Sequence, residues 1–455
     1  MGNKKQENIF IFLLLIIVQV NYILSAAESS SDNLYTFNLR ILGENNLPVI
    51  RIFSNDVTYP EILILDIGIE KTWILNSEKS VSSNDQILKN DFYTGLGYNV
   101  EESLYLENVN NELIEIKNLN YIKVSQINSI NNLNYNGRLS LNKFLSYSNF
   151  ISKINLDENN NINKAYFGFS LKFWNNKGKE EGKLTIGDLS NSVDKLSEYK
   201  IPLINNQENK WKINIKGLFI GDIKEANFDT EINITKKEFN GIYLNSTMNL
   251  ETAHNYIYVN KEILSFLDKN YFSKDGKNLC YKNENDNEVI YNCHNDRIIN
   301  NIYLVFDNNM ALTLNKNDLL NCKKNANLNN EDNKLNLETC EFNIKYSKNV
   351  KENILGFSVL KNIKSYFLFN DNNFIIESND KKIIKCNFMY EEFQNLNSSE
   401  LKDKSKVIFE LIKTILSMIF VFSLLFAALY IHEKFFDKDF KKPEIIINRD
   451  KYSNL

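Results

Sequence analysis

An uncharged apolar run lies close to the C-terminus, from Thr414 to Ile431. Its length is about what an α-helix needs to cross a bilayer core, and extending it back to residue 407 adds only two charged side chains, which can reach the interface. A buried core helix is the competing interpretation, but polar residues flank the run on both sides. The run therefore predicts a transmembrane helix over 407–431.

The first residues have the pattern of a secretory signal peptide. Two lysines precede the apolar run Ile9–Val20, and small residues occupy the −3 and −1 positions of a cleavage site after Ala27. The run is short for a span of ~30 Å, so we favour a cleaved peptide over residues 1–27 to an N-terminal anchor.

Together, the two apolar segments predict a single-pass type I membrane protein. Residues 28–406 would face the lumen or the outside, and the tail 432–455 would face the cytosol. Lysines in the tail agree with the positive-inside rule, although lysines just before the span weaken that argument. We expect the protein in a membrane of the secretory or endosomal pathway or at the cell surface.

Composition excludes one class of partner. The net charge is −4 and there is no basic stripe or block, so nothing indicates nucleic-acid binding. We expect no cofactor. Roughly 380 residues lie between the two membrane-directed segments, which exceeds one ordinary domain and suits two lobes of similar size.

All five cysteines lie in the second half of the chain, and in an oxidising lumen they should pair. Four cysteines allow three connectivities, of which the shortest loops join Cys280–Cys293 and Cys322–Cys340. Cys386 would then be free or pair between chains. A zinc site is the competing interpretation, but one nearby histidine and the lack of a C-x-x-C spacing make it weak, and we expect no metal.

Three sequons mark candidate glycosylation sites on the lumenal side, at Asn233, Asn245 and Asn397. Such sequons also arise by chance in an asparagine-rich chain.

Most of the remaining chain has the pattern of short β-strands. Leu34–Leu42 and Val49–Phe53 alternate in part, and Pro60–Leu65 is nearly continuously apolar. The best helical segment is short, at Lys261–Lys269. Many short strands separated by turn residues predict an all-β fold of the barrel or sandwich type.

Two local motifs carry a specific resemblance. The strand from Ile62 leads into the turn Asp66–Ile69 (DIGI) and then to Trp73, and Phe92–Gly95 (FYTG) follows about two dozen residues later. These resemble the first active-site turn and the flap hairpin of the pepsin-like aspartic peptidases (peptidase family A1), in which the turn reads Asp-Thr-Gly-Ser and the flap Tyr-Gly-Thr-Gly.

Further pieces follow in the order of that family. They are 136–141 (NGRLSL), similar to Asp-Gly-Ile-Leu-Gly-Leu; 182–187, 201–203 and 211–221, similar to the segment joining the lobes; and 354–360 with 367–370, similar to Ile-Leu-Gly and a strand ending in Phe-Asp.

The resemblance covers nearly the whole region between 35 and 380. It implies an all-β, bilobal pepsin-like fold with lobes over 28–200 and 201–385, followed by a stalk over 386–406. The cleft between the lobes would take an extended peptide or a partner protein.

The catalytic pattern of the family is kept only in part. The family uses two aspartates, one from each lobe, which share a proton and activate a water between them. Asp66 and Gly68 match the first turn, but Ile67 and Ile69 stand where the family has hydroxyl-bearing residues. The carboxylate thus lacks hydrogen bonds that would orient it.

The second turn departs further. The best match places Glu251 where the second aspartate belongs, keeps Thr252, and has Ala253 and His254 in place of Gly and Ser. Glu is one methylene longer, which displaces its oxygens by ~1 Å and can cost about a hundredfold in rate. A rival assignment is Asp229–Glu231, but a sequon rather than an apolar strand follows it.

Two neighbouring positions leave alternatives open. His254 could form an ion pair with Glu251, although we favour a surface or turn residue. Phe92 takes the place of the flap tyrosine if the hairpin aligns without a gap, and Tyr93 takes it with a one-residue shift.

The sequence therefore supports two hypotheses, and whether the protein is an enzyme stays open. In the first, a pepsin-like protein has lost most or all activity and keeps a peptide-binding cleft. In the second, a membrane-anchored aspartic endopeptidase works with an Asp66–Glu251 dyad. The altered second turn favours the first hypothesis, because function depends on the site and not on the scaffold.

The tail ends with Tyr452–Leu455 (YSNL), which resembles the endosomal sorting signal read by clathrin adaptors. Such a signal binds as an extended strand, with the tyrosine and the apolar residue in separate pockets. A clathrin adaptor is therefore a candidate partner, although so short a pattern also arises by chance.

Overall fold

The computed structural model describes residues 34–42, 46–54, 59–75, 86–89, 93–129, 135–143, 150–154, 164–176, 179–193, 199–204, 210–223, 231–274, 277–278, 280–285, 287–294, 300–322, 339–377, 382–389, 393 and 412–431. The predicted signal peptide, the tail and Asn397 lie outside these residues. The chain divides into two compact units, 1–390 and 391–455.

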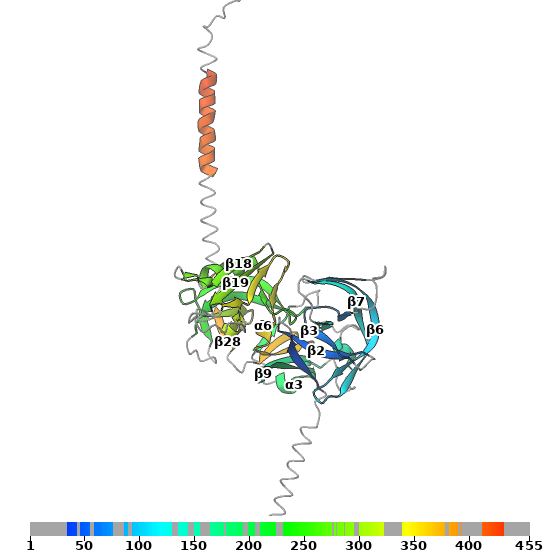
Figure 1. Cartoon of the computed structure of the whole chain (residues 1–455). Helices are drawn as coiled ribbons and strands as arrows, with labels where there is room; N and C mark the ends of the chain where they lie inside the picture. The colour runs from blue at the N-terminus through cyan, green and yellow to red at the C-terminus, as the bar shows by residue number, and fades with distance from the viewer. Residues whose placement is uncertain are drawn as a thin grey trace, which may run out of the picture. The chain divides into compact units, whose positions relative to one another are not determined.

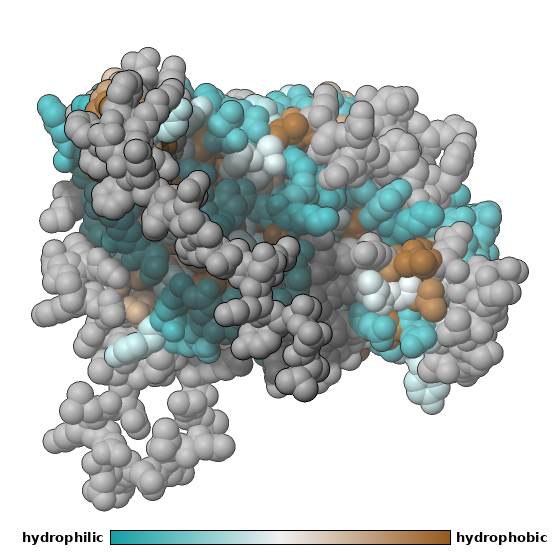
Figure 2. All heavy atoms as spheres, turned by 90° about the horizontal axis from the view of Figure 1, so that it is seen from above, coloured by the Kyte–Doolittle hydropathy of each residue, from teal (hydrophilic) through white to brown (hydrophobic). Residues whose placement is uncertain are grey.

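The first unit is built mainly from two large β-sheets, so the prediction of an all-β, two-lobed chain is confirmed. Strands β6 and β7 belong to one lobe, and β18, β19 and β28 belong to the other (Figure 1). The face drawn in Figure 2 is mostly hydrophilic over its described residues, with apolar residues in small separate groups.

The first sheet has 13 strands among the described residues, in the order β11-β27-β26-β9-β10-β1-β2-β3-β8-β4-β7-β6-β5. Its strands are β1 (Tyr35–Leu42), β2 (Leu47–Phe53), β3 (Glu61–Asp66), β4 (Trp73–Leu75), β5 (Gln86–Lys89), β6 (Tyr93–Glu107), β7 (Leu113–Ser129), β8 (Gly137–Ser140), β9 (Phe167–Asn176), β10 (Lys179–Asp188), β11 (Lys200–Pro202), β26 (Lys364–Leu368) and β27 (Asn373–Glu377).

The second sheet also has 13 described strands, in the order β13-β28-β21-β20-β12-β14-β25-β15-β24-β19-β23-β22, with β18 paired to β19. They are β12 (Lys212–Gly221), β13 (Ile232–Ile234), β14 (Asn240–Leu250), β15 (Ile257–Tyr258), β18 (Cys280–Glu284), β19 (Glu288–His294), β20 (Asn301–Phe306), β21 (Met310–Leu314), β22 (Leu320–Asn321), β23 (Thr339–Phe342), β24 (Ile344–Ser347), β25 (Asn353–Leu355) and β28 (Ile383–Phe388).

The remaining elements of this unit are short. They are helices α2 (Phe150–Lys153), α3 (Ser190–Val193), α4 (Lys261–Leu267), α5 (Lys316–Leu319) and α6 (Phe357–Leu360), the π-helical turn η2 (Asp268–Phe272), and the small hairpin β16 (Ser273–Lys274) and β17 (Lys277–Asn278). Helix α4 lies where the sequence predicts one, and the Asn260 side chain caps it by accepting from the Ile263 amide.

Segments of the chain that cross from one lobe to the other join the two lobes. Strand β26, which follows α6 late in the sequence, returns to the first sheet and pairs with β9. At this junction the Phe169 and Phe367 rings stack with centroids 4.6 Å apart, and the Trp211 indole packs edge-on against both rings. Trp211 Nε1 also donates to the Leu141 carbonyl oxygen at 2.8 Å, so its one polar group is satisfied while the ring is buried.

Both predicted disulfides are present, Cys280–Cys293 and Cys322–Cys340. Cys280 and Cys293 are direct cross-strand partners in the hairpin of β18 and β19. Cys386 is free and fully buried within β28. Its burial leaves the sulfur inaccessible to another folded chain, so of the two expectations for this residue the free thiol is the one the fold allows.

The second unit contains a single described helix, Ile412–Ile431. Its 20 residues are long and apolar enough to cross a membrane, and none of its most apolar stretch is buried. The helix is therefore a candidate membrane span, as the sequence predicts.

Candidate active-site turns

Asp66 stands at the end of β3, where the strand leads into a tight turn. The strand is apolar and nearly all buried because it lies inside the sheet, paired with β2 on one side and β8 on the other. Asp66 is only 1% exposed. Its Oδ1 accepts from the Gly68 amide at 2.8 Å, which closes the turn.

Arg138 forms a buried ion pair with this aspartate. It lies on β8, which runs parallel to β3, and its Nη1 donates to Asp66 Oδ2 at 2.8 Å. Both side chains are almost fully buried, at 5% and 2% exposure. Nη2 donates to the Tyr135 hydroxyl at 3.3 Å. Each oxygen of the Asp66 carboxylate thus already accepts a hydrogen bond from the protein.

Arg138 is a site residue that was not predicted from the sequence. The signal was present: 136–141 (NGRLSL) resembles a family segment in which an isoleucine takes the place of the arginine. An arginine in an otherwise buried short strand needs a partner, and only the parallel register shows that the partner is Asp66.

Glu251 follows β14 in the same way as Asp66 ends β3. β14 runs parallel to β25, and β25 in turn pairs antiparallel with β15, as β8 does with β4. The Glu251 amide donates to the Leu355 carbonyl oxygen at 3.1 Å. The two turns therefore occupy equivalent places in the two lobes.

The rival second turn is only partly described. Asp229 and Thr230 fall outside the described residues, but the strand that follows, β13, pairs with β28 at an end of the second sheet. β13 is paired with β28, whereas β14, which leads into Glu251, is paired with β25, so the described strands favour Glu251 as the counterpart of Asp66.

Thr252 ties the two turns together. Its hydroxyl donates to the Leu65 carbonyl oxygen and accepts from the Ile67 amide at 3.3 Å, and it is fully buried. In the first turn the corresponding residue is Ile67, whose buried aliphatic side chain has no hydroxyl to make the reciprocal contacts. The Thr252 hydroxyl thus links the second turn to the first, and the buried Ile67 makes only apolar contacts in its place on the other side.

The Glu251 side chain lies directly over Gly68 of the opposite lobe. A methyl group on Gly68 would come within 2.7 Å of Glu251 Cγ and 2.8 Å of Cδ. Because the Gly68 amide also binds Asp66, both carboxylates lie against the same glycine. The longer side chain thus occupies space next to Gly68 that only a residue without a Cβ leaves open.

His254 is buried beside Glu251, with Nε2 3.3 Å from Glu251 Oε2. Burial, and secondly the positive charge of Arg138, hold the pKa of His254 well below its ordinary value. This shift favours the neutral form of the ring. Of the expected surface or turn residue, the turn is present but the surface position is wrong, since His254 is only 9% exposed.

The strands of the expected flap form a hairpin. β5 pairs antiparallel with the start of β6, with Lys89 opposite Thr94. Phe92 lies outside the described residues, and Tyr93 is the first residue of β6. The choice between them for the flap position stays a prediction.

Other predicted site residues are placed as follows. Asn233 in β13 and Asn245 in β14 are exposed, as a glycan would require. Within the described part of the chain, no group of three or more His, Cys, Asp or Glu side chains is arranged to hold a metal ion.

Comparison with solved structures supports the topology. A basic 7S globulin from soybean aligns with a TM-score of 0.55 at 12% identity, over 76% of this chain and 95% of its own. Conglutin gamma, a basic 7S globulin from lupine seeds, aligns with a TM-score of 0.55 at 12% identity, over 77% and 96%. An aspartic proteinase from Irpex lacteus aligns with a TM-score of 0.52 at 9% identity, over 76% and 98%.

The fold is pepsin-like. A fold of this kind implies a peptide-binding cleft between the lobes. No protein-family model matches the chain, and no curated protein matches its sequence. At such low identity the likeness to solved structures describes the fold alone, and since the same fold occurs in globulins and in a proteinase, activity must be argued from the two turns.

Proposed function

We propose that this chain is a membrane-anchored, pepsin-like protein that binds an extended peptide or a partner protein in its cleft without cleaving it. The observation that carries the proposal is the buried ion pair between Arg138 and Asp66. Membership of the aspartic peptidase family is part of the proposal and rests on the fold and the ordered motifs.

The ion pair conflicts with aspartic peptidase chemistry. That chemistry needs two carboxylates that share one proton and hold a water between them, so that each aspartate alternates between acid and base. Here one oxygen of Asp66 is bound by a permanently charged guanidinium and the other by the Gly68 amide. Glu251 has its own partner in His254. Each carboxylate is thus paired with a neighbour instead of with the other carboxylate.

A working Asp66–Glu251 dyad remains the second candidate, and one observation favours it. Both carboxylates lie against Gly68, which is the proximity a dyad needs. For this arrangement to work, Arg138 would have to leave Asp66. That exchange would move a guanidinium out of a buried, hydrogen-bonded position, a change that costs about 3–5 kcal/mol when one partner of such a pair is lost.

The deciding experiment is a peptidase assay of the full chain in detergent with denatured casein, between acid and neutral pH. We expect no cleavage above that of the Asp66→Asn variant. Acid cleavage by the unaltered chain that Asp66→Asn abolishes would establish the dyad and overturn the proposal.

Binding is tested separately, by panning a random peptide library against the same protein. Peptides recovered on the unaltered chain should bind Asp66→Asn/Arg138→Met, in which the ion pair is replaced by neutral groups, with altered affinity. Peptides that bind the two forms equally would place the binding surface outside the cleft.

We propose a type I topology for the anchor. The candidate span Ile412–Ile431 and the two disulfides support it, because disulfides are stable in the oxidising secretory pathway. The sorting role of Tyr452–Leu455 belongs to this proposal and lies outside the described residues. Replacing Tyr452 with Ala in a tagged protein should raise its surface amount, and an unchanged distribution would remove the adaptor from the proposal.

A further inference from the structure

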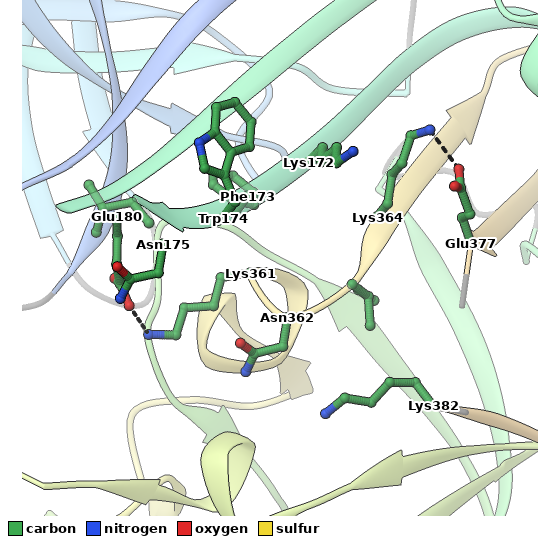
Figure 3. A pocket seen from close by; sticks show the side chains of 12 residues that line it. Lys172, Phe173, Trp174, Asn175, Glu180, Lys361, Asn362, Lys364, Glu377 and Lys382 are labelled. Carbon is green, nitrogen blue, oxygen red and sulfur yellow. Dashed lines mark hydrogen bonds and ion pairs between the residues drawn. The ribbon is translucent and has the colours of Figure 1, made fainter. Parts of the chain in front are cut away.

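A pocket of about 280 Å³ lies away from the two turns, between the late strands of the first lobe and the α6 region. Its walls come from β1, β9, β10, the turn after α6, β26, the end of β27 and the residue just before β28. Figure 3 shows the side chains that line it. The volume is close to the lower end for small-molecule sites in proteins, about 300 Å³.

Lysines dominate the charge of this pocket. The lining includes Lys172, Lys361, Lys364 and Lys382 against two carboxylates, Glu180 and Glu377. Figure 3 shows Lys361 turned toward Glu180 and Lys364 turned toward Glu377, with Lys172 and Lys382 on other parts of the lining. With Asp318 behind Lys382 counted, four lysines stand against three carboxylates, so the pocket keeps a net positive charge, and a concave wall concentrates such a field.

The lysines are held in place by their neighbours. Lys361 Nζ lies 3.2 Å from Glu180 Oε1 and Lys364 Nζ lies 2.6 Å from Glu377 Oε2, both drawn as dashed lines in Figure 3. Lys382 is 8% exposed and is anchored from behind by the fully buried Asp318. These ion pairs hold the lysine ammonium groups in position at the pocket wall. A ligand that binds there therefore orders little additional side chain, and the entropy cost of binding is small.

Lys172 differs from the other three because it is exposed on β9. Its charge contributes to lowering the pKa of Glu377, so it lies near the Lys364–Glu377 pair. An incoming anion can contact Lys172 without first displacing a buried carboxylate.

The chemistry of the wall selects the kind of anion. Ammonium groups act as point charges and suit phosphate or sulfate, whereas a planar carboxylate is recognised best by the two-pronged guanidinium of arginine. Trp174 and Phe173 also line the pocket, and because the Phe173 ring packs edge-on against Phe357, Trp174 is the aromatic side chain that can contact a ring-bearing ligand. We infer that this pocket binds a phosphate or sulfate ester of a small ring-bearing molecule such as a sugar, independently of the cleft.

The test is calorimetric titration of the full chain in detergent at low salt with glucose 6-phosphate, glucose 6-sulfate and glucose. We expect one ester or both to bind with a Kd below about 1 mM and glucose not to bind. Binding of only one ester identifies the anion. Added salt should weaken binding, because the contacts are electrostatic.

Three variants separate this pocket from general charge effects. Lys172→Gln should weaken ester binding about five- to tenfold, and Glu180→Gln, which frees Lys361, should strengthen it several-fold. Lys282→Gln is the control. Lys282 is ion-paired to Glu284 and lies outside the pocket, so its replacement should leave ester binding unchanged.

Two results would overturn the inference. One is no binding of either ester by the unaltered chain up to about 10 mM. The other is equal binding by Lys172→Gln and Lys282→Gln. Because Lys172 is exposed, its replacement should leave the fold intact, and an unchanged melting temperature of the variant checks this.

Discussion

Arg138 Nη1 lies 2.8 Å from Asp66 Oδ2, so the one aspartate that matches an aspartic peptidase turn is neutralised by an arginine from the adjacent parallel strand. A buried pair of this kind is costly to break, because removing one partner leaves the other charge uncompensated. The pair therefore bears on stability as well as on catalysis.

Replacing Arg138 with Met should destabilise the first lobe by roughly 3–5 kcal/mol, because Asp66 then remains buried without its cation. The double variant Arg138→Met/Asp66→Asn should recover a large part of that loss. Chemical unfolding of the unaltered chain, Arg138→Met, Asp66→Asn and the double variant measures the coupling. If the losses of the single variants simply add in the double variant, the ion pair makes no net contribution.

Gly68→Ala should be destabilising by about 1–3 kcal/mol, because the new methyl group would come within 2.7 Å of Glu251 Cγ. Shortening the facing residue, as in Gly68→Ala/Glu251→Ala, should relieve the clash. Melting curves of both variants and of Glu251→Ala provide the comparison. Equal losses in the presence and absence of the Glu251 side chain would show that the strain comes from the backbone.

Glu352 should make stability fall in acid. Burial raises its pKa, but hydrogen bonds from Lys212, Asn249 and Lys210 outweigh this and lower the pKa to about 2. A carboxyl whose pKa is lower in the folded state stabilises the protein above its ordinary pKa of 4.5, and that stability is lost as the pH falls from about 4.5 to about 2.

The contribution of Glu352 should be about 1–2 kcal/mol, since the side chain is partly exposed and solvent screens it. Melting temperatures of the unaltered chain and Glu352→Gln should differ at pH 7 and converge toward pH 2. A constant difference over this range would assign the effect to packing.

Cys386 should resist alkylation in the folded protein. Its thiol is buried, and burial, with a smaller effect of the Glu231 charge, raises its pKa to about 12. Only the thiolate reacts at an appreciable rate. Iodoacetamide should label this residue after denaturation without reductant and leave it unlabelled in native protein, whereas rapid native labelling would mean that β28 opens readily.

Reduction should affect the second lobe. Each disulfide closes a short loop and contributes roughly 3 kcal/mol in the chain-entropy model. Cys280→Ser/Cys293→Ser should therefore unfold at lower denaturant concentration, and the matched variant Cys322→Ser/Cys340→Ser should do the same. If removal of one disulfide leaves the denaturation midpoint unchanged, that disulfide has little effect on the unfolded chain.

Features that depend on neighbouring residues were accessible from the sequence. The continuous apolar strand ending at Asp66, the glycine two residues later, the short cysteine loops and the apolar run at 414–431 are all local patterns, set by strand periodicity, turn chemistry and length. The all-β fold and both disulfides were predicted on this basis.

The pairing of Arg138 with Asp66 and the packing of Glu251 on Gly68 were decided by tertiary structure. These residues are separated by 72 and 183 positions, and their contacts depend on strand register and on how the lobes meet. His254 shows the same limit, since its pKa is lowered by burial in the fold and by the charge of Arg138, which is far away in the sequence. A sequence pattern specifies which side chains are available, but the free energy of a buried charge depends on what the fold places within about 3–4 Å of it.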